Sequence, residues 1–246
     1  MREPIVVTID RVTLDGQGTA IFDGGKPGGS PYGPGGGALN ATVVVDGARG
    51  VVVRGFTIQN SPGGGIIVQK NSSFAVQDTK ILNNYFGVLV RDSSHAELQG
   101  CEITGNTDAG LGVVDTSAVE FTRQVRINQN LEGISAGGRC DLRFSGELLE
   151  ASGNKRNGIS LSGCSFGPPP TLAGHRVVVN DNGTDGLFIG GGQLVIGPLE
   201  FFGFAGALFQ QIVAHNNGAA VSIWQDSRRS SISEEASLIC REMPSV

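Results

Sequence analysis

The sequence has little aromatic bulk, no long hydrophobic run and no excess of basic residues. Aromatic residues supply 6% of the 246 residues, which is too little for a thick sandwich core but suits a thin, repetitive fold. No apolar run approaches the roughly 18 residues of a membrane-spanning helix. The formal net charge of −5 lacks the basic footprint typical of proteins that bind nucleic acid. We therefore expect neither nucleic-acid binding nor membrane insertion.

The amino terminus also lacks the charged, apolar and small-residue segments of a signal peptide. Strand-like sequence nevertheless begins directly at Ile5-Val6-Val7, which favours the loss of an upstream capping segment. If a leader was removed with that segment, the protein would be secreted or periplasmic. The four cysteines show neither C-x-x-C nor zinc-type spacing, so we expect no metal site built from them.

A glycine followed by three mostly apolar residues recurs along the chain, and the spacing widens from 22 to 32 residues. The recurring glycines are Gly65, Gly87, Gly110, Gly133, Gly158, Gly186 and Gly218. A coil of this length holds three short strands and three turns, so the repeat predicts a solenoid. We expect these glycines to adopt positive φ, where they cost little steric strain.

An asparagine precedes most of these glycines by three or four residues, at Asn84, Asn106, Asn130, Asn154 and Asn182. Parallel coils stack about 4.8 Å apart, so equivalent asparagines can bond one another in a continuous ladder. A second polar turn recurs at 71–73, 92–94 and 115–117. Between the turns, apolar residues alternate with polar ones, as in Ala96 and Leu98 around Glu97, which predicts strands with one inward face.

These features together predict an all-β chain that folds as a right-handed parallel β-helix solenoid of about seven to nine coils. We expect a single domain over 1–246. An introductory coil and Gly-rich loop would occupy 5–49, regular coils 50–225, and a carboxyl-terminal cap or tail 226–246. Within the last segment, Ser233 to Met243 predicts a short capping helix, with Ser233 as N-cap.

The stretch Asn83-Asn84-Tyr85-Phe86-Gly87-Val88-Leu89-Val90, followed by Cys101 to Asn106, resembles the repeats of the pectin-lyase-like superfamily, including NosD-type repeat proteins. The resemblance covers roughly 50–223 and implies the right-handed β-helix fold. It does not imply one activity, because that superfamily includes lyases, hydrolases, esterases, epimerases, tailspikes, adhesins and non-enzymatic proteins.

The clearest match to a catalytic motif is Asn182-Gly183-Thr184-Asp185-Gly186, which resembles the Asn-Thr-Asp-Gly motif of polygalacturonase-type hydrolases. The next coil offers His215-Asn216-Asn217 instead of the further carboxylates that this chemistry requires. We therefore interpret Asp185 first as a turn residue.

A looser set of candidates lies in the turn before the repeat glycine, where successive coils supply Asp108, Glu132, Arg156, Asp185 and His215. We call these five residues the turn cluster. Stacking would place neighbours about 5 Å apart and Glu132 about 10 Å from Asp185. They are the candidate catalytic residues, and no bound cofactor is expected unless the protein is a lyase. A lyase would also need calcium, held by acidic residues against a uronate.

The outward row of the strand after the repeat glycine contains Ile67, Leu89, Gly112, Ser135, Ser160 and Phe188. This row is small or apolar, which favours an inert wall. Cys140 and Cys164 occupy nearly equivalent positions one coil apart. They either stack as thiols or form a disulfide, the latter only in an oxidising compartment.

Two functions are compatible with these features. The first is a β-helix repeat module that presents an elongated surface to a polysaccharide or another extended partner, without catalysis. The alternative is a carbohydrate-active enzyme acting on an acidic polysaccharide through the turn cluster, a lyase before a glycoside hydrolase.

Overall fold

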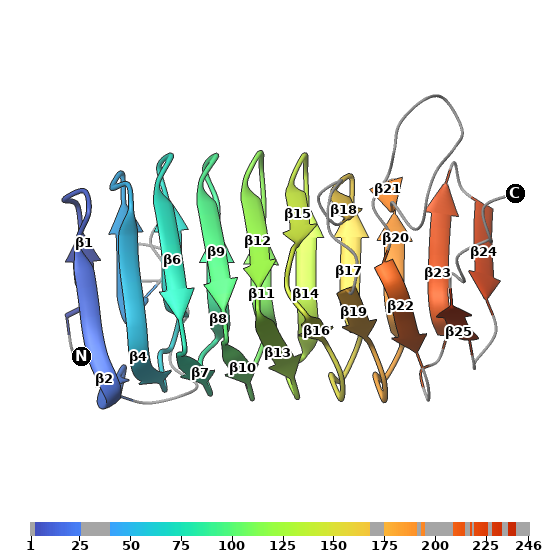
Figure 1. The fold of residues 1–246 in the computed structure, drawn as a ribbon, viewed down its shortest axis with the longest axis horizontal. Helices are drawn as coiled ribbons and strands as arrows, with labels where there is room; N and C mark the ends of the chain where they lie inside the picture. Colours follow the sequence, from blue (N-terminus) through green and yellow to red (C-terminus); the bar gives the residue numbers. More distant parts are fainter. Residues whose placement is uncertain are drawn as a thin grey trace, which may run out of the picture.

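The chain forms a solenoid of short strands that stack along one long axis (Figure 1). The computed structural model describes residues 3–25, 40–167, 175–190, 193–194, 209–214, 217, 219–225, 228–232 and 236–239. Over these residues the secondary structure is entirely β, which confirms the predicted fold class. No helix in this part of the chain is long and apolar enough to cross a membrane.

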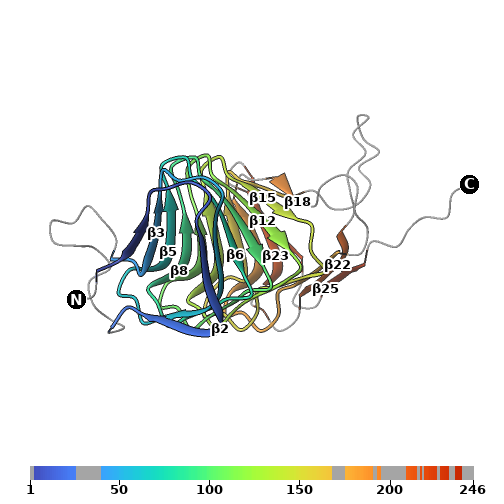
Figure 2. The same cartoon turned by 60° about the vertical axis from the view of Figure 1, so that its left-hand side comes forward.

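The first sheet is one wall of the solenoid, and its strands from β1 to β23 are all parallel. Its strands are β1 (Ile5–Val7), β3 (Val43–Asp46), β5 (Gly64–Gln69), β8 (Phe86–Val90), β11 (Ala109–Val113), β14 (Glu132–Gly137), β17 (Ile159–Ser162), β20 (Asp185–Gly190), β23 (Ala219–Gln225) and β24 (Arg228–Ile232). Figure 2 shows β3, β5 and β8 on the opposite side of the solenoid from β6, β12 and β15.

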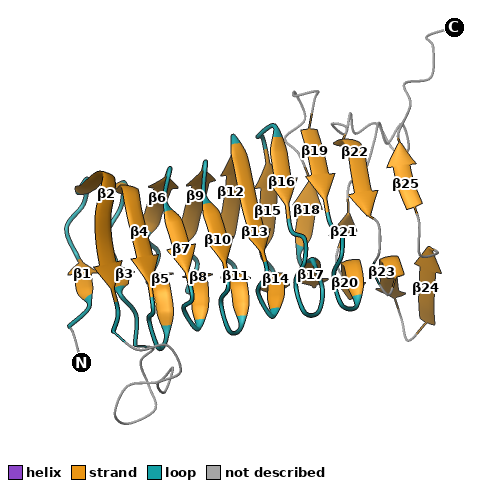
Figure 3. Cartoon of the chain, turned by 90° about the horizontal axis from the view of Figure 1, so that it is seen from below, coloured by secondary structure: helices purple, strands orange, loops and turns teal. Residues whose placement is uncertain are grey.

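The second sheet supplies the other two walls, because the long strand β4 (Val51–Gln59) pairs with β6 through its first half and with β7 through its second. One wall holds β6 (Ser73–Gln77), β9 (His95–Gln99), β12 (Ala118–Thr122), β15 (Asp141–Phe144), β18 (Ser165–Gly167) and β21 (Gln193–Leu194). The other, which faces the viewer in Figure 3, holds β7 (Lys80–Leu82), β10 (Glu102–Thr104), β13 (Gln124–Asn128), β16 (Leu148–Glu150), β19 (His175–Val178), β22 (Phe209–Ala214) and β25 (Ala236–Ile239). Strand β2 (Thr13–Asp23) pairs with β4 at the amino-terminal end.

Five consecutive coils lie wholly within the described residues, namely β3–β4, β5–β7, β8–β10, β11–β13 and β14–β16. This count is slightly lower than the seven to nine expected. The difference arises in the later coils, which have the longer glycine spacings and contain residues outside the described set. The Gly-rich loop expected after the introductory coil also falls mostly outside it.

The core is a stack of aliphatic and aromatic columns, one from each wall, whose members are in register from coil to coil. The columns are Ile66–Val88–Leu111–Ile134–Ile159–Leu187, Val53–Val76–Leu98–Phe121–Phe144 and Ile58–Ile81–Ile103–Ile127. Every member is fully or almost fully buried. The predicted alternation is therefore confirmed, since inward residues fill the bore and leave the polar ones outside.

The asparagine ladder is also present, and it is longer than predicted. From Asn106 to Asn182, each asparagine accepts two hydrogen bonds at Oδ1, from the main-chain N and the Nδ2 of the asparagine one coil before. Ser61 opens the ladder by donating to Asn84, and Asn217 continues it beyond Asn182. The 35-residue gap between Asn182 and Asn217 hid this last member in the sequence.

The prediction of positive φ at the repeat glycines is wrong for those within the described residues, because none of them adopts it. Glycine is required there by contact with the ladder instead. A Cβ on Gly65 would lie 2.8 Å from the carbonyl oxygen of Gly87 and 2.9 Å from Asn84 Nδ2. The left-handed conformation appears at the corner between the two walls of the second sheet, at Gly55, Asp78, Gly100 and Arg123.

The predicted capping helix over 233–243 is wrong, because Ala236–Ile239 forms strand β25. Strand β25 pairs antiparallel with β22, and β24 pairs antiparallel with β23. An open solenoid end presents unpaired N–H and C=O groups, and pairing with them outweighs a weak local helix preference. The last turns of the solenoid are thus covered by strands.

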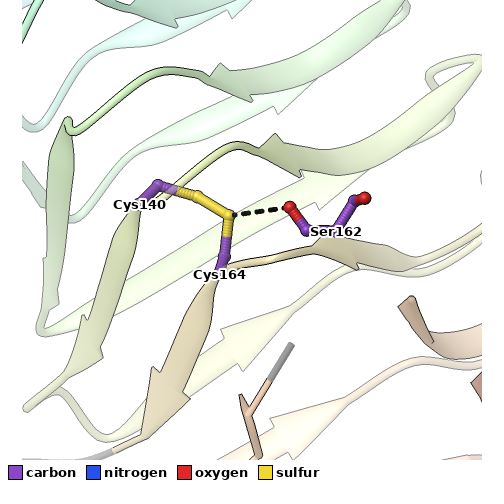
Figure 4. Close-up of a disulfide and its surroundings, with 3 residues drawn as sticks. All are labelled: Cys140, Ser162 and Cys164. Carbon is purple, nitrogen blue, oxygen red and sulfur yellow. Dashed lines mark hydrogen bonds between the residues drawn. A yellow bond between two sulfur atoms is a disulfide. The ribbon is translucent and has the colours of Figure 1, made fainter. Parts of the chain in front are cut away.

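The second polar turn forms its own buried column, in which Ser72 N donates to Ser94 Oγ and Ser94 N donates to Ser117 Oγ. The next two members are Cys140 and Cys164, which form a disulfide with their Cα atoms 4.7 Å apart (Figure 4). Of the two arrangements left open by the sequence, the structure therefore has the disulfide.

Candidate functional site

The turn cluster stands at the entrance to the first sheet, but it does not form one column. Glu132 is the first residue of β14, and Asp185 is the first residue of β20. Glu132 is in register with Ala109, so Asp108 lies one position earlier in its own coil. Gly133 N donates to the carbonyl oxygen of Asn157, which places Asn157 beside Glu132. Arg156 therefore also lies one position early in its coil. His215 lies outside the described residues.

Glu132 and Arg156 are brought together across one coil step. Arg156 Nη1 lies 4.0 Å from Glu132 Oε1, and the glutamate side chain is 15% exposed while the arginine side chain is 61% exposed. Glu132 Oε2 is buried and accepts no hydrogen bond within the described part of the molecule. One oxygen of this carboxyl thus faces a cation at the surface, and the other is held in a dry environment.

Burial raises the pKa of Glu132, and the nearby Asp108 carboxylate adds to the rise. Arg156 and hydrogen bonds from Asn157 oppose it without cancelling it. A carboxyl with a raised pKa can hold a proton in conditions where an exposed carboxyl has lost it. Glu132 therefore has the chemistry of a proton donor or acceptor.

Asn157 is the member that the sequence reasoning missed. Its Oδ1 accepts a hydrogen bond from Thr184 Oγ1 at 2.5 Å and another from the main-chain N of Asp185 at 3.1 Å. Asn157 therefore lies between Glu132 and Asp185 in the same column. It immediately precedes Gly158, as Glu132 precedes Gly133 and Asp185 precedes Gly186, so counting back from the glycine would have found it.

The outward row of the first sheet has the predicted register from Ile67 to Phe188. Its first half is closed, because Ile67 and Leu89 pack with Ala41 in a small apolar cluster outside the main core and are 2% and 8% exposed. Ser135 is the one residue of this row that is exposed rather than buried or half-buried. This wall offers few groups that could hold a polar ligand.

A different wall carries a regular polar surface that the sequence reasoning did not single out. The outward residues of β6, β9, β12 and β15, which lie side by side in Figure 1, form three rows in register. We call them the polar face: Ser73–His95–Ala118–Asp141, Ala75–Glu97–Glu120–Arg143 and Gln77–Gln99–Thr122. They include no phenylalanine, tyrosine or tryptophan.

Hydrogen bonds between neighbouring coils hold the side chains of the polar face in place. Thr122 Oγ1 donates to Glu97 Oε1 at 3.2 Å, and Ser145 Oγ donates to Glu120 Oε1 at 2.8 Å. Within β15 itself, Arg143 Nε donates to Asp141 Oδ2 at 2.8 Å. Glu97 and Glu120 lie directly opposite each other on adjacent strands, so two carboxylates stand about one coil step apart.

Residues 37–167 match the family model described as right handed beta helix region, and this match spans more than half of the chain. The chain belongs to the right-handed β-helix family. Searches of curated proteins and of solved structures found no significant match. In this β-helix the matched region contains the whole polar face together with Asp108, Glu132 and Arg156, and it ends before Asp185.

A lyase would need calcium, which binds to a cluster of oxygen ligands. Among the residues that the structure describes, no group of three or more His, Cys, Asp or Glu side chains is arranged to hold a metal ion. Glu97 and Glu120 supply only two carboxylates, whereas calcium takes about six to eight oxygen ligands. The described residues therefore do not fit a protein-built calcium site.

Proposed function

We propose that this β-helix is a binding module whose polar face holds an extended, hydroxyl-rich polysaccharide. The observation that carries the proposal is the register of the polar rows, which sets Glu97 beside Glu120, and Gln77 beside Gln99 and Thr122, at coil steps of about 4.8 Å. A polymer lying along the solenoid axis would meet hydrogen-bonding groups on several successive coils.

The chemistry of the polar face favours a neutral polymer over an acidic one. Glu97 and Glu120 can accept hydrogen bonds from sugar hydroxyls, and bonds to a charged acceptor are about twice as strong as neutral ones. A uronate chain would instead bring further negative charge against two aligned carboxylates. Because the face has no aromatic platform, we expect each sugar to be held weakly and the affinity to grow with chain length.

Retention of the purified protein on insoluble polymers tests this proposal. The panel holds neutral glucans and mannans beside polygalacturonate and alginate, each with and without calcium. We expect retention on a neutral polymer, lost in the double variant Glu97→Ala with Glu120→Ala. The matched control is Glu102→Ala with Glu150→Ala, which removes two carboxylates from another wall. Equal retention of both double variants would contradict the assignment to the polar face.

The environment of Glu132 supports a second candidate function, acid–base catalysis on a polysaccharide. A raised pKa, a buried oxygen without a hydrogen bond and a neighbouring guanidinium are features of a general acid or base. Glu132 and Asp185 stand two coil steps apart, about 10 Å. This is just above the roughly 6.5–9.5 Å between the carboxyls of inverting glycosidases.

The same polymer panel distinguishes the two functions when it is followed for turnover. New reducing ends would indicate hydrolysis, and ultraviolet absorbance of an unsaturated sugar would indicate elimination. For an enzyme, Glu132→Gln should abolish turnover while Glu97→Gln leaves it in place. Retention of the wild-type protein without either signal would leave the binding module as the function.

A further inference from the structure

The Cys140–Cys164 disulfide joins the same two coils that build the Glu132 site. Cys140 follows β14 by three residues, and Cys164 follows β17 by two. At the other end of this strand pair, Glu132 opens β14 and contacts Arg156, which precedes β17. The disulfide and the Glu132 site thus hold opposite ends of one pair of parallel strands.

The disulfide lies directly before the paired strands β15 and β18, which are short within the described residues. Strands β9 and β12 have five residues each, β15 has four, β18 has three and β21 has two. The register between β15 and β18 extends over three residue pairs, and that between β18 and β21 over two. The pairing of β12 with β15 spans four residue pairs, so the covalent link adds to a short backbone ladder.

The disulfide also replaces a weaker link of the same column. In earlier coils this turn is joined by hydrogen bonds from main-chain N to serine Oγ of 3.1 and 3.2 Å, at Ser94 and Ser117. Cys140 and Cys164 are buried like those serines, at 2% and 1% exposure. The column therefore passes from hydrogen bonds to a covalent bond at the step between β14 and β17.

We propose that Cys140–Cys164 is a covalent latch that keeps the later coils, which supply Arg156 and Asn157 to the Glu132 site, docked on β14. An external dithiol would supply two electrons and two protons, so that the S–S bond breaks, two thiols form and the dithiol becomes a disulfide. Because each coil of a solenoid contacts only its neighbours, the opening stays local to β17 and the coils after it. The latched form belongs to an oxidising compartment.

Peptide mapping of the alkylated, non-reduced protein tests whether the latch forms. Trypsin cleaves after Arg139, Arg143, Arg156 and Arg176, so the disulfide should join fragments 140–143 and 157–176. Alkylation of Cys140 or Cys164 in the non-reduced protein, or a link from either to another cysteine, would overturn the proposal.

Hydrogen exchange of the full chain tests what the latch does. After reduction with dithiothreitol, we expect amides in peptides covering β17 and β20 to exchange roughly 10- to 100-fold faster. Amides in peptides covering β5 and β11 should change less than about twofold. Unchanged exchange at β17 and β20 in protein shown to be reduced, or equal acceleration everywhere, would contradict a local latch.

A double variant separates the covalent bond from the packing of the turn. Cys140→Ser with Cys164→Ser extends the serine column of Ser72, Ser94 and Ser117, and should reproduce the faster exchange without any response to dithiothreitol. The control is Cys101→Ser, at a buried free cysteine whose thiol pKa is raised by burial to about 12; its response to dithiothreitol should match wild type. A double variant that exchanges like oxidised wild-type protein would overturn the proposal.

Discussion

Asn106 donates two hydrogen bonds to the same oxygen of Asn130, from Nδ2 at 2.8 Å and from its main-chain N at 3.0 Å. It accepts the equivalent pair from Asn84 at its own Oδ1. All three side chains are almost fully buried. Buried polar groups require partners, so each asparagine satisfies the turn of the coil before it and the ladder fixes how the coils stack.

Removing one ladder asparagine should therefore destabilise the whole solenoid. Asn106→Ala removes the acceptor of two buried hydrogen bonds from Asn84, and we expect it to lower the free energy of unfolding by about 2–4 kcal/mol. The measurement is urea unfolding followed by circular dichroism. Thr107→Ala, at the exposed next residue, is the control and should change stability by no more than about 0.5 kcal/mol. Similar losses in the two variants would refute a special role for the ladder.

The repeat glycines should be intolerant of a methyl group because they pack against the asparagine ladder. A Cβ on Gly110 would lie 2.7 Å from Asn130 Nδ2 and 3.0 Å from the carbonyl oxygen of Gly133. Gly110→Ala should therefore cost about 1–3 kcal/mol through overpacking. At Gly137 a Cβ would meet nothing within 4 Å, so Gly137→Ala should be neutral or stabilising by up to about 1 kcal/mol. The thermal unfolding midpoints of Gly110→Ala and Gly137→Ala test this difference. Equal midpoints would mean that contact with the ladder does not exclude a methyl group at Gly110.

The solenoid could be predicted because its determinants are local and periodic. Asn84 to Asn182 and the glycines that follow them mark one turn in each coil, and alternation around Leu98 and Ile103 marks the inward face. The carboxyl-terminal cap could not be predicted in the same way. Pairing of β24 and β25 depends on free strand edges that exist only after the rest of the chain has folded.

The candidate sites depended on register, which residue spacing gives only to within one position. Asp108 and Arg156 were grouped with Glu132, although the structure places them one position early and Asn157 in the shared column. The alignment of Glu97 with Glu120 likewise requires the coil-to-coil register. A shift of one residue moves a side chain to another face, so small counting errors matter more for sites than for the fold.

Glu97 should destabilise the folded protein through its charge. It lies between Ala75 and Glu120 in its row, and like charges directly opposite on adjacent strands are unfavourable. Glu97→Gln should stabilise the protein by up to about 1 kcal/mol at low salt, with the gain shrinking as salt screens the repulsion.

Urea unfolding at two salt concentrations measures this effect. The control is Glu150→Gln, because Glu150 Oε2 lies 3.2 Å from Arg126 Nε and loses an attractive partner instead. It should be neutral or destabilising by at most about 1 kcal/mol. Stabilisation by Glu97→Gln that does not depend on salt would count against an electrostatic cause.

The raised pKa of Glu132 should make stability depend on pH in a defined direction. Burial lifts the pKa above the ordinary value of 4.5, so the folded chain binds this proton more tightly than the unfolded chain does. The contribution to stability is fully present below pH 4.5 and is lost as the pH rises through the folded pKa. The glutamine in Glu132→Gln cannot titrate, so the stability of this variant relative to wild type should increase as the pH rises above 4.5.

Arg156 partly opposes the rise in the pKa of Glu132, so removing Arg156 should enlarge the pH dependence of stability. In Arg156→Ala the pKa of Glu132 should rise further, so this variant should lose more stability between pH 4.5 and neutrality than wild type does. The double variant with Glu132→Gln should remove that additional loss. Urea midpoints for the four proteins from pH 4 to pH 8 provide the measurement. If the urea midpoints of wild type and Glu132→Gln change with pH in parallel, Glu132 titrates like an exposed carboxyl. That outcome would contradict its assignment as an acid–base group.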